Sequence, residues 1–196
     1  MTNVEKMKQG LWYDANFDEE LLRLREEAAD LVFQLRQISP KETTKREELL
    51  RQLFPHCGKD VVIFQPLAVD YGFHTYIGDH SFINYGAYFM DDAPIHIGSH
   101  CFIGPNCGLY TAIHATLPDE RNAGWEQAKP IKIGNNVWIG GDVTILPGVT
   151  IGDGTIIGAK SCVTKEIPAG VIAGGNPCRV IRAITADDSI WKEKSV

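Results

Sequence analysis

One histidine of the chain occupies a position from which it could act as a general base. His114 directly precedes a polar stretch, residues 115–130, in which the regular apolar spacing of the flanking sequence stops. An imidazole that is neutral near pH 7 can take a proton from a hydroxyl group, and functional side chains are common on loops held by a rigid scaffold. An ordinary solvated side chain is the alternative, because the chain has six histidines.

Basic residues concentrate near the C-terminus of an otherwise acidic chain. Residues 158–184 carry four lysines and arginines and a single glutamate, whereas the whole chain has a formal net charge of −6. Local positive charge suits a small polyanion such as a nucleotide phosphate, and the neighbouring Gly174-Gly175 pair allows close backbone approach. A solvated terminus is the alternative. The basic residues are Lys160, Lys165, Arg179 and Arg182.

Four further side chains are candidates for contacts with a small ligand. Trp138 points outward by the register described below, where an aromatic side chain forms either an interface or a ligand wall. Asn84 follows an inward isoleucine, Asp92 lies where the repeat slips by two residues, and Asp70 precedes the first clear repeat. Each of these three is also a common residue of solvated turns, so that structural alternative stays open.

The histidines and cysteines do not predict a metal or thiol site. His96 and His100 are four residues apart, which gathers ligands on a helix, but this region has strand-like periodicity. We therefore interpret them as surface histidines. Cys101 and Cys107 fall in inward positions, where apolar surroundings raise the pKa of a thiol, and we interpret both as core residues.

A six-residue repeat must position these side chains. Seven Ile-Gly dipeptides occur after residue 60, and inward aliphatic residues recur every six positions from Ile133 to Val163. Residues two apart on a strand share a face, so each aliphatic residue and the small or β-branched residue two before it point the same way. We expect the Gly or Asn that follows to supply the turn conformation. This pattern is typical of a hexapeptide β-helix, which by analogy with its class is left-handed.

The first 58 residues predict a helical subdomain. Leu21, Leu24, Ala28 and Leu31 recur at steps of three and four, which indicates an amphipathic helix that ends at Ser39-Pro40. A second helix is predicted to begin at Thr44, which with Glu47 has the pattern of a capping box. We assign residues 1–58 to this subdomain, 59–185 to the β-helix with an extruded loop at 115–130, and 186–196 to a tail.

Composition bounds the class of protein. The 196 residues are 44% hydrophobic and 22% charged, which excludes a disordered chain, and the acidic balance argues against a general nucleic-acid binder. No apolar run approaches the roughly 18 residues of a membrane span, and the N-terminus lacks the apolar core of a signal peptide. Five cysteines without a C-x-x-C pair predict neither a disulfide framework nor a zinc ribbon. We expect a cytoplasmic protein.

Several segments together resemble the galactoside/maltose O-acetyltransferases. The carboxyl-terminal motifs also resemble other hexapeptide acyltransferases, including enzymes that modify antibiotics, whereas the helical N-terminus resembles the sugar-modifying branch more specifically. The segments are Lys6-Met7-x-x-Gly10-x-x-Tyr13, Ile133-Gly-Asn-Asn-Val-Trp-Ile-Gly-Gly141, Pro147-Gly-Val-Thr-Ile-Gly152, Val163-Thr-Lys165 and Gly175-Asn-Pro-Cys-Arg-Val-Ile-Arg182.

The resemblance implies a reaction and a set of site residues. It implies an acetyl-CoA-dependent homotrimer with active sites between subunits, no metal, His114 as general base and the backbone N–H of Gly141 as oxyanion donor. The implied acceptor contacts are Asp14 (or, with a looser alignment, Asp18), Asp70, Asn84, Asp92 and Trp138. The implied CoA contacts are Gly141, Ala159, Thr164, Lys165, Arg179 and Arg182. Asp70 weakly favours the maltose-like branch.

Other functions stay open on the sequence. One is acetylation of a non-sugar acceptor such as an antibiotic. A second is a metal-dependent hydratase resembling the carbonic anhydrases that use the same repeat with bridging histidines, which would leave the basic residues without a role. A third is a solenoid that only scaffolds partners.

Overall fold

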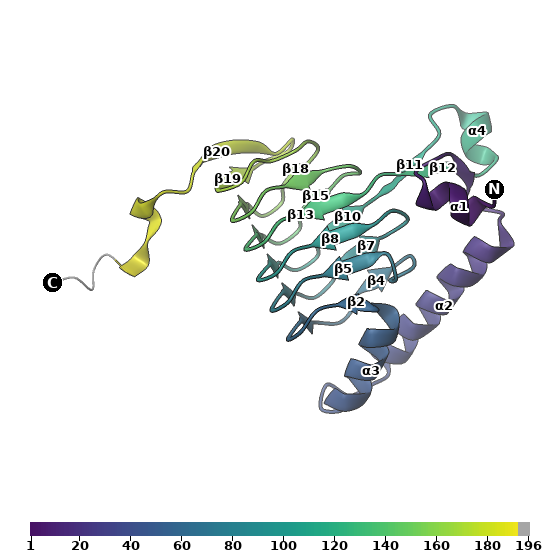
Figure 1. Ribbon diagram of the computed structural model, residues 1–196, viewed down its shortest axis with the longest axis horizontal. Helices are drawn as coiled ribbons and strands as arrows, with labels where there is room; N and C mark the ends of the chain where they lie inside the picture. The colour runs from purple at the N-terminus through teal and green to yellow at the C-terminus, as the bar shows by residue number, and fades with distance from the viewer. Residues whose placement is uncertain (192–196) are drawn as a thin grey trace.

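The computed structural model describes residues 1–191 and consists of a parallel β-helix with helices packed on one side (Figure 1). Each coil visits three parallel sheets in turn, which we call faces one, two and three. Face one contains β2 (His56–Cys57), β5 (Thr75–Ile77), β8 (Ile95–Ile97), β13 (Ile131–Ile133) and β16 (Thr150–Ile151). Face two contains β3 (Val62–Ile63), β6 (Phe82–Ile83), β9 (Phe102–Ile103), β14 (Trp138–Ile139), β17 (Ile156–Ile157), β19 (Val171–Gly174) and antiparallel β20 (Arg179–Ala183). Face three contains β4 (Ala68–Val69), β7 (Tyr88–Met90), β10 (Gly108–Tyr110), β15 (Thr144–Ile145) and β18 (Cys162–Val163).

The inward column of the repeat forms the core, as the six-residue spacing predicts. Ile97 pairs with Ile133, and Ile133 pairs with Ile151, on face one, and all three side chains are buried. Cys101 and Cys107 are buried as well, which confirms their assignment to the core. Burying each such aliphatic side chain contributes about 1.5–3 kcal/mol, and stacking equivalent residues makes that burial continuous from coil to coil.

The glycines after the inward isoleucines serve a purpose other than the predicted one. The left-handed backbone conformation occurs two residues later, at His100 (φ 57°) and Asn136 (φ 56°). A Cβ atom added at Gly98 would lie 2.5 Å from the carbonyl oxygen of Gly134 in the next coil. Glycine is therefore required there because adjacent corners stack too closely for any side chain.

The N-terminal segment supplies three helices: α2 runs along the side of the coils, α1 lies beside β11 and β12, and α3 lies beside β2 at the first coil (Figure 1). Helix α1 spans Asn3–Lys8 and α2 spans Glu19–Arg36, with Asp18 as its side-chain cap. Helix α3 spans Thr43–Leu53, so it begins one residue before the predicted Thr44, and Glu42 precedes it without a side-chain cap. The predicted capping box is therefore wrong. Apolar residues of α2 and α3 join the core of the coils.

The extruded segment is an antiparallel hairpin that the N-terminus completes. Strand β11 (Ala112–His114) leads into α4 (Pro118–Asn122), and β12 (Trp125–Ala128) returns to face one. Strand β1 (Tyr13–Asp14) pairs with the outer edge of β12. The resulting sheet has the order β1-β12-β11, which we call the cap sheet. In Figure 1 it lies beside α1 and the N-terminus, at the side of the coils.

A short 3₁₀ helix (Ala186–Asp188) follows β20, and residues 192–196 of the assigned tail lie outside the described residues. No helix within residues 1–191 has the length and hydropathy needed to cross a membrane.

Candidate active site

The predicted site residues occupy two corners of the coil and one face. Asp70 and Asp92 follow strands of face three, and the hairpin that bears His114 leaves from the same corner; we call it the hairpin corner. Thr164 and Lys165 follow β18 farther along this corner. The other predicted residues lie elsewhere: Asn84, Gly141 and Ala159 between faces two and three, and Trp138, Arg179 and Arg182 on strands of face two.

His114 is paired with a carboxylate that the sequence analysis did not identify. It lies opposite Glu126 in the antiparallel register of β11 and β12, so both side chains project from the same face of the cap sheet. The Nδ1 atom of His114 is 3.5 Å from Oε2 of Glu126, and the imidazole is 56% exposed whereas the glutamate side chain is 7% exposed. A buried acceptor therefore contacts one ring nitrogen and leaves the other facing outward.

Tyr13 brings the N-terminus to the same carboxylate. It lies opposite Glu126 in the register of β1 and β12, and its hydroxyl donates a short hydrogen bond to Oε1 of Glu126. The same hydroxyl is 3.4 Å from Oδ1 of Asp92. Tyr13, Glu126 and Asp92 are all buried, so His114 stands at the exposed end of a buried polar cluster.

Asp92 retains its proton more readily than an ordinary carboxyl group. Burial, followed by the negative charges of Glu126 and Asp70, raises the pKa of Asp92 to about 8. Arg25 of α2 opposes this shift. Oδ2 of Asp92 is buried without a hydrogen-bond partner among the described residues, and such an atom is costly unless a ligand or water meets it.

Asp70 belongs to the same corner. Its Oδ1 accepts a hydrogen bond of 2.6 Å from the hydroxyl of Tyr88. Burial is the main cause that raises the pKa of Asp70, while the hydrogen bond from Tyr88 acts in the opposite direction. Asp70, Asp92 and Glu126 are thus close enough to influence one another electrostatically, and Glu126 links this group to the outward imidazole.

The two alternative N-terminal carboxylates have local structural roles. Oδ1 of Asp14 accepts the backbone N–H groups of Asn16 and Phe17. Asp14 lies opposite Trp125 and next to Tyr13 in the register, so its side chain projects from the opposite face of the cap sheet to His114. Asp18 caps α2 through Leu21 and accepts a hydrogen bond from Asn3. Neither carboxylate joins the cluster at the hairpin corner.

Gly141 and Ala159 stack at the corner between faces two and three. Lys160 donates its backbone N–H to the carbonyl of Gly141, and a Cβ at the adjacent Gly140 would lie 2.6 Å from the nitrogen of Ala159. Within residues 1–191 the N–H of Gly141 has no acceptor, so this donor is available to a ligand. Asn84 lies at the same corner nearer the N-terminus, where its side chain accepts the N–H of Tyr85.

Trp138 belongs to an apolar column on the outer surface of face two. It pairs with Phe102 on one side and Ile156 on the other, and its side chain points outward as predicted, with 55% exposure. Six successive outward positions of this column, from β3 to β19, are apolar, and Arg182 of β20 lies opposite the last of them. They are Val62, Phe82, Phe102, Trp138, Ile156 and Ile172.

The basic residues lie on the exposed surface at the C-terminal end. Lys160, Lys165 and Arg179 are exposed. The guanidinium of Arg182 makes two hydrogen bonds with the carboxylate of Asp188, at 2.7 and 2.8 Å, which raises the pKa of Arg182 above its usual value. A phosphate would have to compete with Asp188 for Arg182, whereas the side chain of Arg179 bonds the backbone carbonyl of the neighbouring Cys178.

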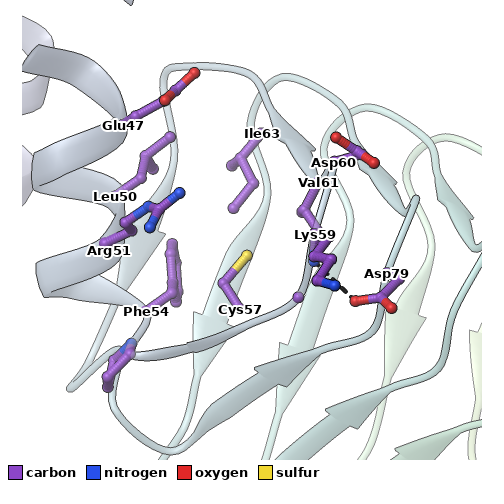
Figure 2. Close-up of a pocket in the computed structure, with 12 residues that line it drawn as sticks. Glu47, Leu50, Arg51, Phe54, Cys57, Lys59, Asp60, Val61, Ile63 and Asp79 are labelled. Atoms are coloured by element: carbon purple, nitrogen blue, oxygen red, sulfur yellow. Dashed lines mark hydrogen bonds between the residues drawn. The ribbon is translucent and has the colours of Figure 1, made fainter. Parts of the chain in front are cut away.

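The larger of two described cavities lies away from these residues. It has a volume of about 790 Å³ and opens between α3 and the first coil, with Leu50, Phe54 and Cys57 on its walls (Figure 2). In Figure 2 the charged side chains of Arg51 and Asp60 stand around this space. A cavity of about 280 Å³ lies between Trp12 and Trp125. Because Trp125 projects from the opposite face of the cap sheet to His114, neither cavity contains the imidazole.

Glu126 and Tyr13 could not be identified from spacing. Glu126 lies in the stretch where the repeat stops, and Tyr13 is 113 residues away in sequence. The segment Trp125-Glu126-Gln127-Ala128 has no strict alternation of apolar and polar residues that would mark Glu126 as a buried strand residue. His96 and His100 join no group of three potential metal ligands within the described residues.

Three parts of the chain match known family models. Residues 6–58 match the maltose acetyltransferase hexapeptide capping motif. Residues 130–165 match the bacterial transferase hexapeptide repeat, and residues 94–114 match the hexapeptide repeat of succinyl-transferase. A putative acetyltransferase of Staphylococcus aureus (strain Mu50) is 50% identical over 187 residues, which cover 95% of this chain and 94% of the relative.

Solved structures agree over nearly the whole length. A maltose O-acetyltransferase from Clostridium difficile 630 has a TM-score of 0.91 at 46% identity, covering 94% of this chain and 98% of that one. A galactoside acetyltransferase in complex with coenzyme A also has a TM-score of 0.91, at 38% identity, covering 96% of this chain and 94% of that one. The protein therefore belongs to the maltose/galactoside O-acetyltransferase family of hexapeptide-repeat acetyltransferases.

Proposed function

We propose that the protein transfers the acetyl group of acetyl-CoA to a hydroxyl group of a sugar of the maltose, glucose or galactoside class. The observation that carries this proposal is the outward imidazole of His114 backed by the buried carboxylate of Glu126. A sugar acceptor is supported by the maltose and galactoside acetyltransferase relatives and by the carboxyl groups of the hairpin corner, which can bind hydroxyl groups.

His114 acts as the general base. The carboxylate of Glu126, 3.5 Å from Nδ1, favours the tautomer with the proton on Nδ1, which leaves Nε2 unprotonated and directed outward to take the proton of the attacking hydroxyl. The carboxylate then stabilises the imidazolium that forms. The hydroxyl oxygen attacks the thioester carbonyl carbon of acetyl-CoA, and the N–H of Gly141 is available to stabilise the negative charge that develops on the carbonyl oxygen. The C–S bond then breaks, and the CoA thiolate leaves as the thiol after it takes the proton from the imidazolium of His114.

We assign the residues at the two corners of the coil, and those on face two, to contacts with the acceptor and with CoA. Asp70 and Asp92 bind hydroxyl groups of the acceptor beside His114, and the unpartnered Oδ2 of Asp92 is suited to this contact. Asn84 and Trp138 complete the acceptor site. Ala159 and Thr164 line the CoA site, and Lys165, Arg179 and Arg182 bind its phosphates. Asp14 stays a proposed acceptor contact through Oδ2, because the local backbone donors engage its other oxygen, Oδ1.

A homotrimer with active sites between subunits explains why these groups are separated in one chain. The six-residue apolar column of face two includes Phe102 and Trp138, which are 57% and 55% exposed, and apolar surface that is continuous over several residues favours a protein interface. Face two of one subunit would meet the hairpin corner of another and so join the two sets of residues. The five cysteines are free thiols, which fits a cytoplasmic location.

The test is CoA thiol release from acetyl-CoA across glucose, maltose, galactosides and chloramphenicol, with wild type and His114→Ala side by side. We expect sugar-dependent release in wild type and a loss of turnover of about 10²- to 10⁴-fold in the variant, with unfolding temperature and CoA binding retained. Activity with chloramphenicol alone would replace the sugar with an antibiotic acceptor. Unchanged turnover in His114→Ala would contradict the general-base role.

Two other functions are separated by binding measurements. A metal-dependent hydratase would contain bound zinc in an elemental analysis of the purified protein and would hydrate carbon dioxide. A scaffold would not bind CoA. The proposal requires CoA binding, so calorimetric titration with CoA decides between the enzyme and the scaffold independently of the choice of acceptor.

A further inference from the structure

The carboxylate of Glu126 has to be held in place if it is to select one tautomer of His114. Its side chain is buried, and a buried carboxylate needs hydrogen-bond donors to offset its desolvation. Two polar groups meet it: Nδ1 of His114 at one oxygen and the hydroxyl of Tyr13 at the other. Tyr13 is thus the donor that approaches Glu126 from inside the protein.

The direction of the hydrogen bonds around Tyr13 follows from counting protons. A phenol has one proton, and the short contact with Glu126 uses it. The oxygen of Tyr13 can then meet Oδ1 of Asp92, 3.4 Å away, only by accepting a proton from it. Burial and neighbouring negative charges raise the pKa of Asp92 to about 8, so this carboxyl group carries that proton at neutral pH.

We propose that Tyr13 is a positioning residue: its hydroxyl accepts from Asp92 and donates to one oxygen of Glu126, so that the other oxygen of Glu126 faces Nδ1 of His114 and holds His114 in the Nδ1–H tautomer. The proposal rests on the proposed function of His114 as the base. It assigns the N-terminal strand a part in catalysis that is distinct from the stabilisation of the fold.

Strand pairing and hydrogen bonds to the backbone of neighbouring residues fix the position of Tyr13. Strand β1 is fixed to β12 by its register, the side chain of Gln127 donates to the carbonyl of Gly10 at 2.7 Å, and the N–H of Ala15 bonds the carbonyl of Gly124. The ring of Tyr13 packs in a small core with Met7, Leu21 and Tyr71. The hydroxyl therefore reaches Glu126 from a rigid support.

Tyr13→Phe tests the proposal, because it keeps the ring in its core and removes only the donor. We expect kcat to fall about tenfold or more, as for loss of a hydrogen bond to a charged group, with the KM values for acetyl-CoA and sugar unchanged. The matched control is Tyr71→Phe. Tyr71 is equally buried in the same small core, but its hydroxyl accepts from Arg25, so kcat should be retained.

A spectroscopic readout is independent of turnover. With ¹⁵N-labelled histidine, NMR at neutral pH should report the Nδ1–H tautomer of His114 in wild type and Tyr71→Phe, and a mixture of tautomers in Tyr13→Phe. The signals are assigned by their absence in His114→Ala. An unchanged tautomer or an unchanged kcat in a folded Tyr13→Phe protein would overturn the proposal, because a purely structural role moves neither without unfolding.

The role of Tyr13 can still be tested if wild type transfers no acetyl group or if Tyr13→Phe does not fold. If wild type transfers no acetyl group, the proposed function fails, while the tautomer measurement still decides the role of Tyr13. If Tyr13→Phe does not fold, the hydroxyl proton of Tyr13 is observed directly. It should give a downfield, slowly exchanging resonance in wild type that disappears in Glu126→Ala, and persistence of that resonance would refute the contact with Glu126.

Discussion

The coils and the cap sheet are built in opposite ways. In the coils, strands pair in parallel with equivalent residues of the next coil, and the inward side chains are apolar, as in the series Leu109, Ile145 and Val163. In the cap sheet, strands pair antiparallel and join β1 to a hairpin more than a hundred residues later. The coils bury aliphatic groups, whereas the cap sheet buries Tyr13 and Glu126.

This difference separates stability from chemistry. An aliphatic column contributes through the area it removes from water, and none of its members titrates. The buried groups at the cap sheet are polar and charged, so each is tolerated only while its partners remain. We therefore expect variants in the coils to change the free energy of unfolding, and variants at the cap sheet to change turnover and pH dependence.

The largest effect is expected from the coils. Ile145→Ala removes three methyl or methylene groups from a fully buried side chain and should lower the free energy of unfolding by about 2–5 kcal/mol. Ile190→Ala is the matched control, because its side chain is 81% exposed, and its change should stay within about 0.5 kcal/mol. Urea denaturation measures both.

The same pair of variants tests whether stability in the coils is independent of chemistry at the cap sheet. While Ile145→Ala remains folded, its kcat should match wild type, since the Ile145 side chain is fully buried in the apolar core of the coils whereas the His114 imidazole is exposed on the cap sheet. A loss of kcat in proportion to the loss of stability would show that the coils and the cap sheet are energetically coupled.

How far the sequence can predict each region follows from the range of its contacts. The coils repeat every six residues, so spacing alone places Ile139 inward and Trp138 outward, and the structure agrees. The cap sheet depends on pairing between Tyr13 and Glu126, which no local pattern encodes. The role of Gly98 was misjudged for a similar reason, since the next coil and not its own turn excludes a side chain.

The predicted site residues also differ in whether local spacing or long-range pairing determines their positions. Register placed His114 at an exposed position beside the loop, but its partner Glu126 could be recognised only when β11 and β12 were paired. Asp14 is close in sequence to Tyr13, yet alternation along β1 directs it to the opposite face of the cap sheet. One residue of register therefore separates the side chain that contacts Glu126 from the side chain on the opposite face.

An intermediate effect, dependent on pH, is expected at Asp92. Its pKa is raised to about 8 in the folded state, so between about pH 4 and pH 8 the folded protein keeps a proton that the unfolded chain releases. Stability contributed by this proton is lost as the pH rises through that window. Asp92→Asn has no such titration, so its stability relative to wild type should increase by about 1 kcal/mol or more from pH 5 to pH 8.

Urea denaturation at the two pH values measures this change. Glu48→Gln, on the exposed surface of α3, is the control, and its difference from wild type should be the same at both pH values. A pH-independent difference for Asp92→Asn would mean that Asp92 is ionised in the folded protein, which would remove the donor that we assign to it beside Tyr13.

The smallest effect is expected at the C-terminal end of the coils, where the charges are solvated. Arg179→Ala should raise the Kd for CoA by about two- to fivefold, the range for an exposed ion pair, and should leave kcat unchanged because Arg179 lies on β20, away from the hairpin corner. Lys132→Ala on face one removes the same charge from a different surface and should leave Kd unchanged. Isothermal titration at low and high salt separates the two variants, since only the contact with a phosphate weakens as salt screens it. If Arg179→Ala instead lowers kcat with Kd unchanged, the C-terminal strand takes part in the chemistry, and the separation between coils and cap sheet does not extend to that end of the molecule.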